Sequence, residues 1–532
     1  MREVHEKQGK REILQGILGI LMTPFWKNHR FIGLAMLAVQ FILGVITLYW
    51  GTHVDEADNL VVGNLIFRGA TLYKEVFSHH FPFPYIWMSA VVALAGKSII
   101  AARLSVLIFH TVGFAIAMLA SRKYLLTGIT ALLWGIVRPF YLGHMVLYTS
   151  FAGVALFVVL VVTLAILDDT VKPSWTQWIT LAFFSWIAFL AGPLSAYAIF
   201  TSLVFLLLKH PASGLKTGLL LLAGLLPTLT LFILTDTLQP FWENAILFNA
   251  NVYNAYTDAN PVRITDWLVQ VLSGLGIPFG QWFRFDPLKP IEFGYSLIDA
   301  WLFTGFLYRL GLVTASFLYL LHKKYSAGAY LYLFAAATLL IARAHFRSQA
   351  FILAALTALA VLVVEQVRWA EVRPLLASLA RGLRLVTLVM AFWLGIRLSG
   401  QIILERQNLT YDANFRKLER AGDRLDRLAC GMENVHLADY PEGMYSYWFS
   451  DLAPVSKYIF MWPWVAEVGQ QEMIRELQEQ PLAIVVVTDE VVWDAYPTLE
   501  YLAPLVEYLD ANYHKVSKDT YISPALFESC PP

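Results

Sequence analysis

Residues 145–167 read MVLYTSFAGVALFVVLVVTLAIL, an apolar run that contains no charged side chain. About 20 apolar residues in a helix cross the roughly 30 Å hydrocarbon core of a bilayer, so this run predicts a transmembrane helix. Similar runs recur at 31–50, 99–120, 218–234, 328–342, 350–364 and 385–404. Hydrophobic residues make up 58% of the 532 positions and charged residues 15%, which leaves too little polar surface for a water-soluble protein of this length. We therefore predict a polytopic α-helical membrane protein with about 11–13 transmembrane helices.

The distribution of positive charge predicts which side of the membrane each loop faces. Lysine and arginine gather before residue 31, at 122–123, at 209–216, at 323–324 and across 368–384. Loops rich in these residues stay in the cytoplasm. Residues 1–30 are therefore predicted to be a cytoplasmic amphipathic segment, and the transmembrane part, residues 31–404, is predicted to have external loops near 51–81 and 236–295. The net charge of zero argues against a nucleic-acid partner.

One apolar run does not fit this orientation. About twelve runs would return the C-terminal end to the side of the N-terminus, whereas the charges place residues 405–532 on the opposite side. The short runs 81–96 and 125–137 are the candidates, because either is short enough to enter the membrane without crossing it.

The composition changes after residue 404 to that of a small water-soluble domain. Apolar and charged residues alternate at helical spacing over 414–428, and 485–487 is a β-branched run. A further strand is predicted at 434–438 and further helices at 470–478 and 498–510, so we expect an extracytoplasmic α/β domain over 405–532. Both cysteines, Cys430 and Cys530, fall in this domain, and an oxidising compartment would permit a disulfide between them. Two unrelated thiols are the alternative.

Three acidic residues follow the first apolar run, in the segment GTHVDEADN at 51–59. The apolar residues in 60–65 have the spacing of a helix that lies in the membrane interface, which Asp55 would cap, with Glu56 and Asp58 in its first turn. Acids are favoured at a helix N-terminus whatever their chemistry, because the helix dipole stabilises negative charge there. A functional interpretation is also open, since a carboxylate at the membrane edge can take the proton of a hydroxyl group that attacks an anomeric carbon.

The acidic pair and the residues after it resemble the first external loop of the GT-C superfamily of membrane glycosyltransferases. Bacterial members similar to the aminoarabinose and protein mannosyl transferases have an acidic pair, then a Gly-x-x-Leu-Tyr-like turn and a His-x-Pro entry to the next helix. Here these motifs correspond to Asp55 and Glu56, to GATLY at 69–73, and to HFP at 80–82. The resemblance covers the transmembrane part in layout and this loop in motif, and it implies a GT-C-like fold.

The resemblance also implies a reaction. A sugar would move with inversion from a polyprenyl-phosphate carrier to a hydroxyl group of a glycan, lipid or protein, with Asp55 or Glu56 as the general base. The resemblance also implies that the protein lies in a bacterial plasma (inner) membrane, whose lipids surround its helices. The Trp-Trp-Asp-type motif of oligosaccharyltransferases is absent, with only MWPW at 461–464 near it, so transfer of an oligosaccharide to asparagine is not expected.

A second group of candidate residues carries positive charge. Arg343, His345 and Arg347 lie between two apolar runs at a turn predicted to be external, and a spacing of four puts the two arginines on one helix face. There they would hold the leaving phosphate of the carrier, a role that a basic residue of a late external loop has in the resembling families. The alternative is that both arginines reach to lipid headgroups. Further candidates for substrate contact are His79, His80, Arg138 and Tyr73.

The sequence requires no cofactor, but a divalent cation, Mg²⁺ or Mn²⁺, is a candidate. Asp55, Glu56, Asp58 and His79 have side chains that bind metal ions, although they do not form a closed set of ligands. Metal dependence is therefore left open.

Two other functions are also open. A transporter or flippase of lipid-linked sugars would need ionisable groups near the midplane of the membrane, for which Arg103, Asp299 and Arg309 are the candidates. A catalytically silent scaffold would instead bind protein partners through the C-terminal domain. The acids gather in an external loop rather than within the transmembrane helices, which favours the enzyme.

Overall fold

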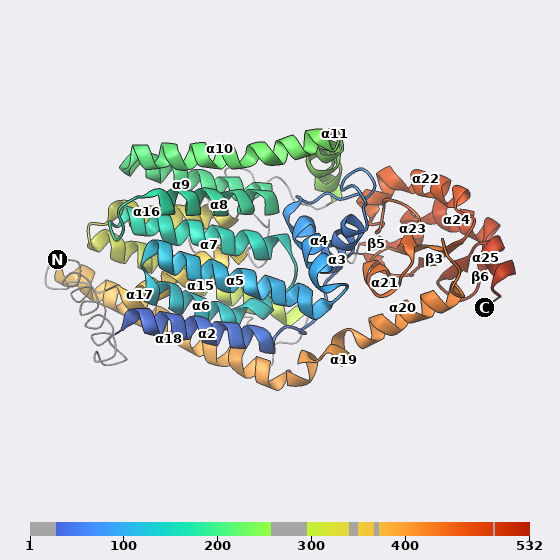
Figure 1. The fold of residues 1–532 in the computed structure, drawn as a ribbon. Helices are drawn as coiled ribbons and strands as arrows, with labels where there is room; N and C mark the ends of the chain where they lie inside the picture. Colours follow the sequence, from blue (N-terminus) through green and yellow to red (C-terminus); the bar gives the residue numbers. More distant parts are fainter. Residues whose placement is uncertain (1–27, 257–294, 340–348, 366–371, 493–494, 532) are drawn as a thin grey trace, which may run out of the picture.

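The computed structural model describes residues 28–256, 295–339, 349–365, 372–492 and 495–531. They form a bundle of helices with a smaller α/β domain at one end (Figure 1). Five helices of the described part are long and apolar enough to cross a membrane: α2 (His29–Ile46), α5 (Ile99–Ser121), α7 (Tyr148–Leu167), α10 (Pro211–Leu234) and α18 (Pro374–Leu404). Other helices of the bundle are α6 (Tyr124–Val137), α8 (Trp175–Ala191), α9 (Ala196–Lys209), α15 (Tyr295–Leu321), α16 (Tyr325–Thr338) and α17 (Gln349–Val364). The protein is a polytopic α-helical membrane protein, as predicted.

The centre of the bundle is α7, the helix formed by the most apolar run of the sequence. Every residue from Thr149 to Leu167 is buried, because α5, α8, α9 and α17 pack around this helix. By contrast, α10 packs against α8 and α9 and exposes a stripe formed by Leu215, Leu219, Leu222 and Leu226. In a membrane protein such a stripe faces lipid, so α10 lies at the edge of the bundle.

Small residues let helices of the bundle approach one another closely. A Cβ atom at Gly128 of α6 would lie 2.7 Å from the Cα atom of Gly33 in α2, so no larger side chain fits there. Membrane helices associate through such contacts because lipid provides little hydrophobic driving force between apolar surfaces. This close contact holds α6 against α2 although α6 has only 14 residues.

The two short apolar runs that complicated the orientation occupy different places. α6 runs beside α2 within the bundle, whereas α4 (Phe83–Ala95) lies with α3 (Val54–Phe67) at the end next to the C-terminal domain (Figure 1). With 13 residues in α4 and 14 in α6, both helices are about 20 Å long, so their position rather than their length distinguishes them. We infer that the run at 81–96 is the one that does not cross the membrane.

The C-terminal domain contains a five-stranded sheet in the order β2-β1-β3-β7-β6. β1 (His436–Tyr440) is parallel to β2 (Ala453–Pro454) and to β3 (Ala483–Val487). β7 (Thr520–Ile522) is antiparallel to β3 and to β6 (His514–Lys515). The domain also contains the hairpin of β4 (Val491–Val492) and β5 (Tyr496–Pro497) and the helices α20 (Arg416–Leu428), α21 (Met444–Phe449), α22 (Pro463–Glu479), α24 (Ala503–Asn512) and α25 (Pro524–Ser529).

The elements predicted in this domain all occur, with shifted ends. The strand predicted at 434–438 lies at His436–Tyr440, and the helix predicted from residue 470 begins at Pro463, because a proline is favoured in the first turn of a helix. The helix predicted at 498–510 is divided at Leu502 into α23 (Thr498–Tyr501) and α24. Pro504, near the start of α24, accounts for the division, since its ring cannot continue a helix from the preceding turn.

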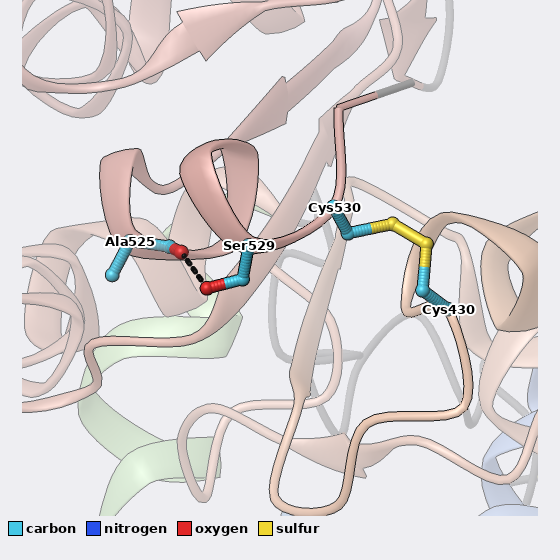
Figure 2. The surroundings of a disulfide bond; sticks show 4 residues. All are labelled: Cys430, Ala525, Ser529 and Cys530. Atoms are coloured by element: carbon cyan, nitrogen blue, oxygen red, sulfur yellow. Dashed lines mark hydrogen bonds between the residues drawn. A yellow bond between two sulfur atoms is a disulfide. The ribbon is translucent and has the colours of Figure 1, made fainter.

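A disulfide joins the two cysteines of the domain. Cys430 follows α20 and Cys530 follows α25. Their Cα atoms are 6.2 Å apart, and the two residues are separated by 100 in the sequence (Figure 2). The last helix of the chain is thereby tied to the helix that enters the domain. Of the two alternatives left open by the sequence, the structure has the bonded pair.

Candidate active site

The acidic segment forms the first turn of α3. His53 is the residue that caps this helix: its Nδ1 accepts a hydrogen bond of 3.2 Å from the backbone N–H of Asp55. The sequence-based assignment of Asp55 as the cap is therefore wrong by two residues, because the imidazole of His53 takes the position that an aspartate would fill. Asp55 lies instead within the first turn, where the helix dipole favours its negative charge.

α3 is not exposed at a membrane interface, as its spacing had suggested. Every residue from Glu56 to Asn64 is buried, because α4 covers one side of the helix and α21 of the C-terminal domain covers another. The side-chain amide of Asn59 donates to the carbonyl of Asp55 and, over 3.0 Å, to the carbonyl of Val146 just before α7. The acidic turn is therefore fixed between the bundle and the C-terminal domain.

Glu56 is held in a closed hydrogen-bonding arrangement. Its carboxylate accepts from Nε of Arg103 at 2.9 Å and from Nη2 of Arg103 at 2.5 Å, in a bidentate ion pair whose two side chains have no exposed surface. The N–H of Val146 and the hydroxyl of Tyr445 each approach one of the same oxygens at 3.2 Å. Both oxygens are occupied, so Glu56 has no lone pair directed at a substrate.

Asp55 differs from its neighbour. Its side chain is 23% exposed, and His53, whose Nδ1 lies 3.7 Å from its carboxylate, is the one basic residue paired with it in the described part of the chain. The charge of Asp55 contributes to raising the pKa of Asp58 and of Glu442, and it opposes the lowering of the pKa of His80 by burial. Those three residues therefore lie close enough to Asp55 to interact with its charge.

Asp58 lies one turn further along α3 and is buried. Its Oδ2 accepts a 2.6 Å hydrogen bond from the hydroxyl of Tyr85, which in turn lies 2.6 Å from Oγ of Ser78. Its Oδ1 has no hydrogen-bond partner among the described residues. Burial raises the pKa of Asp58 to about 7, against the lowering effect of the Tyr85 hydrogen bond, and the charge of Asp55 raises it further.

The turn at residues 73–80 brings together three residues singled out by the sequence. The hydroxyl of Tyr73 donates to the carbonyl of His80 over 2.8 Å, and the His80 ring stacks on Tyr148 at the start of α7. The His79 ring packs among aromatic rings, including that of Tyr253 at 5.3 Å. Tyr253 belongs to a π-helical segment, η4 (Trp242–Leu247) and η5 (Asn249–Tyr253), which lies within the described part of the predicted external loop. Burial lowers the pKa of His80, so its ring is neutral at pH 7.

The basic candidates are only partly described. Arg343, His345 and Arg347 lie outside the described residues. Arg138, at the end of α6, is fully buried, and its Nη2 donates to the carbonyl of Gly44 over 3.0 Å. Its Nε and Nη1 have no partner in the described part of the protein, where Arg138 also has no ion pair with a carboxylate.

The four candidate metal ligands do not converge. Within the described residues, no three His, Cys, Asp or Glu side chains are grouped so that they could hold a metal ion. The reason is local, since the oxygens of Glu56 already accept from Arg103, Val146 and Tyr445, and one oxygen of Asp58 accepts from Tyr85. The described members of this set therefore do not fit a metal centre.

Sequence reasoning missed the residues that hold the acidic turn in place. Arg103 was considered only for transport, and Tyr445 and Tyr85 were not singled out. One signal for Arg103 was available, because an arginine within an apolar run must find a partner. Nothing in the sequence indicates that Tyr445, 389 positions after Glu56, supplies the hydroxyl next to it.

Comparisons with known proteins show the fold. No protein-family model matches the sequence, and no curated protein matches it. The apo structure of ArnT from Cupriavidus metallidurans is 14% identical, with a TM-score of 0.52 over 94% of this chain and 98% of ArnT. ArnT bound to undecaprenyl phosphate is 13% identical, with a TM-score of 0.50 over 93% of this chain and 98% of ArnT. The chain therefore has the fold of a GT-C membrane protein over nearly its whole length, as its motifs predicted.

An oligosaccharyltransferase from Archaeoglobus fulgidus, tethered with an acceptor peptide, is also similar. It is 13% identical, with a TM-score of 0.48 over 86% of this chain and 69% of the transferase. The match to ArnT includes almost all of both chains, whereas the transferase has a large part without a counterpart here.

Proposed function

We propose that this protein is a membrane glycosyltransferase that moves a sugar from a polyprenyl-phosphate carrier to a hydroxyl acceptor. The observation that carries the proposal is the contrast within the acidic pair. Glu56 is enclosed by Arg103 and Tyr445, whereas Asp55 is partly exposed at the end of the bundle where the C-terminal domain lies. Asp55 is therefore the general base of the proposed reaction. The likeness in fold to ArnT, solved with undecaprenyl phosphate, supports the choice of carrier.

The chemistry is a single displacement. The carboxylate of Asp55 takes the proton of the acceptor hydroxyl as its oxygen attacks the anomeric carbon, forming the new glycosidic bond. The bond between the anomeric carbon and the phosphate oxygen breaks, and its electron pair leaves with the carrier phosphate. Because the nucleophile enters opposite the leaving group, the anomeric configuration inverts.

The leaving phosphate needs positive charge near it. Arg138 is suited to this role, because its guanidinium is buried and two of its nitrogens have no partner among the described residues. A charge-assisted hydrogen bond to a phosphate oxygen would satisfy both groups. Arg343, His345 and Arg347 remain proposed partners of the same phosphate, and His79, His80 and Tyr73 are proposed to form the side of the site that faces the acceptor.

The proposed placement in the cell follows the charge distribution. Residues 1–30 would be cytoplasmic, and the acidic turn and residues 405–532 would lie on the far side of a bacterial plasma membrane. Of the groups that a transporter could use, Arg103 is not available to a substrate within the membrane: its N–H groups are bound to Glu56 and to the carbonyls of Leu48, Trp50 and Gly51.

Mass spectrometry of cells with and without the chain tests this function. Deletion should lead to accumulation of one polyprenyl-phosphate sugar and loss of that sugar from a glycan, lipid or protein. Complementation with the wild-type chain should reverse both changes, whereas complementation with the Asp55→Asn variant should reverse neither. Unchanged lipid-linked sugars and unchanged acceptors would contradict the proposal. A scaffold would instead be indicated if the Asp55→Asn chain complemented fully.

A further inference from the structure

Tyr445 brings a hydroxyl group of the C-terminal domain to the acidic turn. Tyr445 lies on α21, and its buried hydroxyl is 3.2 Å from Oε2 of Glu56. The same hydroxyl is 3.4 Å from both the backbone nitrogen and the backbone oxygen of His53, the cap of α3. Tyr445 therefore contacts the chain on both sides of Asp55, at the residue two positions before it and at the residue immediately after it.

α21 is anchored where it makes this contact. Lys97, just before α5, donates to the carbonyl of Ser450 at the C-terminal end of α21 over 2.7 Å and pairs with Asp451 at 3.0 Å. On its other side α21 packs against α20, where a Cβ atom at Gly422 would lie 2.6 Å from the backbone of Phe449. The hydroxyl of Tyr445 is thus supplied by a short helix held at fixed positions by both the bundle and its own domain.

The bundle presents the other half of the arrangement. The N–H groups of Arg103 are divided between Glu56 and three backbone carbonyls in the segment that leads from α2 to α3. The guanidinium also lies over the ring of Phe415, 5.0 Å from its centroid, at the entrance to the C-terminal domain. Glu56 therefore binds groups of both the bundle and the C-terminal domain, and its position fixes that of Asp55.

We infer that Tyr445 is a positioning residue, through which the C-terminal domain sets the geometry of Asp55 by holding Glu56 and the cap of α3. This inference rests on the proposed function, since it takes Asp55 to be the base. A general base must lie within about 3 Å of the proton that it removes, so a small rotation of the first turn of α3 slows proton transfer without changing the contacts of the bound carrier. The C-terminal domain is then part of the catalytic unit rather than an appended module.

The test compares two tyrosines of the same short helix. Tyr445→Phe keeps the ring and removes the hydroxyl next to Glu56. Tyr447→Phe is the matched control, because Tyr447 is also buried in α21 but its hydroxyl accepts from the N–H of Asp439 within the domain.

Each full-length variant is purified and its kcat, its KM for the polyprenyl-phosphate sugar and its melting temperature are measured. We expect Tyr445→Phe to lower kcat about three- to tenfold, as for the loss of one hydrogen bond, with KM within twofold of wild type. Tyr447→Phe should leave kcat unchanged.

A double-mutant cycle shows whether Tyr445 acts through Glu56. Adding Tyr445→Phe to Glu56→Gln should lower kcat by less than twofold, because the contact that the hydroxyl makes has already been altered. Equal falls in kcat for the two tyrosine variants, or a full three- to tenfold effect of Tyr445→Phe in the Glu56→Gln background, would overturn the inference. So would wild-type kcat in Tyr445→Phe. Loss of the proposed function is a separate outcome, recognised by transfer that persists in Asp55→Asn.

Discussion

Two buried arginines near the acidic turn have opposite surroundings. Arg103, in α5, is matched by the carboxylate of Glu56 and by three backbone carbonyls. Arg138, at the end of α6, is just as buried, but its Nη2 donates to the carbonyl of Gly44 and its other nitrogens have no partner in the described part of the chain. A buried charge is costly unless it is paired, and among the described residues no carboxylate pairs with the second arginine, which therefore suits it to bind an anion. Arg103 thus forms a structural ion pair, whereas Arg138 is the proposed contact for a phosphate.

The largest expected effect is the loss of folding stability when the paired arginine, Arg103, is replaced. Arg103→Met leaves the carboxylate of Glu56 buried and unpaired, which costs about 3–5 kcal/mol of folding free energy. We expect a large fall in the melting temperature of the purified protein. The double variant Glu56→Gln/Arg103→Met should recover part of the loss, because the unpaired carboxylate is gone. A melting temperature unchanged by Arg103→Met would contradict the assignment of this pair as structural.

Replacing the second arginine, Arg138, with methionine should not lower the melting temperature. Arg138→Met removes a buried charge that has no carboxylate partner among the described residues, so without substrate the melting temperature should stay the same or rise. Binding of a polyprenyl phosphate should weaken by about 10- to 100-fold, as expected for the loss of a charge-assisted hydrogen bond of about 1.5–3 kcal/mol. Microscale thermophoresis with polyprenyl phosphate, and with free polyprenol as the control ligand, measures this change. Equal loss of both ligands would show that Arg138 does not contact the phosphate.

A smaller effect on stability concerns Asp58, a buried acid that is paired with no cation within the described ranges of the chain. The pKa of Asp58 is raised to about 7 from an ordinary value of 3.8, so the folded protein retains a proton that the unfolded chain has released. Its contribution to stability is complete below pH 3.8 and is lost as the pH rises through 7, by up to about 4 kcal/mol. The melting temperature of Asp58→Asn should therefore fall less between pH 5 and pH 8 than that of the wild type.

Asp439 supplies the comparison for that experiment. Burial raises its pKa to about 7 as well, but it lies in β1 of the C-terminal domain. Asp439→Asn should reduce the pH dependence of stability by a similar amount, and the two substitutions together should remove most of it. An undiminished pH dependence in Asp58→Asn would show that this carboxyl is ionised in the folded protein at pH 5.

The sequence predicted what depends on local pattern. The apolar run at 145–167 is the centre of the bundle, and the change in composition after residue 404 marks the α/β domain. The acidic segment was identified from its position after the first apolar run. Each of these predictions used neighbours in the sequence, whose relation is fixed by the period of a helix or a strand.

The sequence could not decide between Asp55 and Glu56. Successive residues of a helix point about 100° apart, so only one of two neighbours can face a given partner. Which one is buried depends on Arg103, 47 positions away, and on Tyr445, 389 positions away. The same distant contacts bury α3, which has the spacing of an interfacial helix but is covered by α4 and α21. Long-range packing of this kind leaves no local signature.

The most direct test of the proposed mechanism is single-turnover transfer by two matched variants, Asp55→Asn and Glu56→Gln, with melting temperatures measured on the same samples. We predict that Asp55→Asn keeps the wild-type melting temperature and transfers sugar about 10²- to 10⁴-fold more slowly, the usual contribution of a general base. Glu56→Gln should melt at a lower temperature, yet its folded molecules should transfer sugar much faster than Asp55→Asn. Near-normal transfer by Asp55→Asn, with transfer abolished in folded Glu56→Gln, would contradict the assignment of Asp55 as the base.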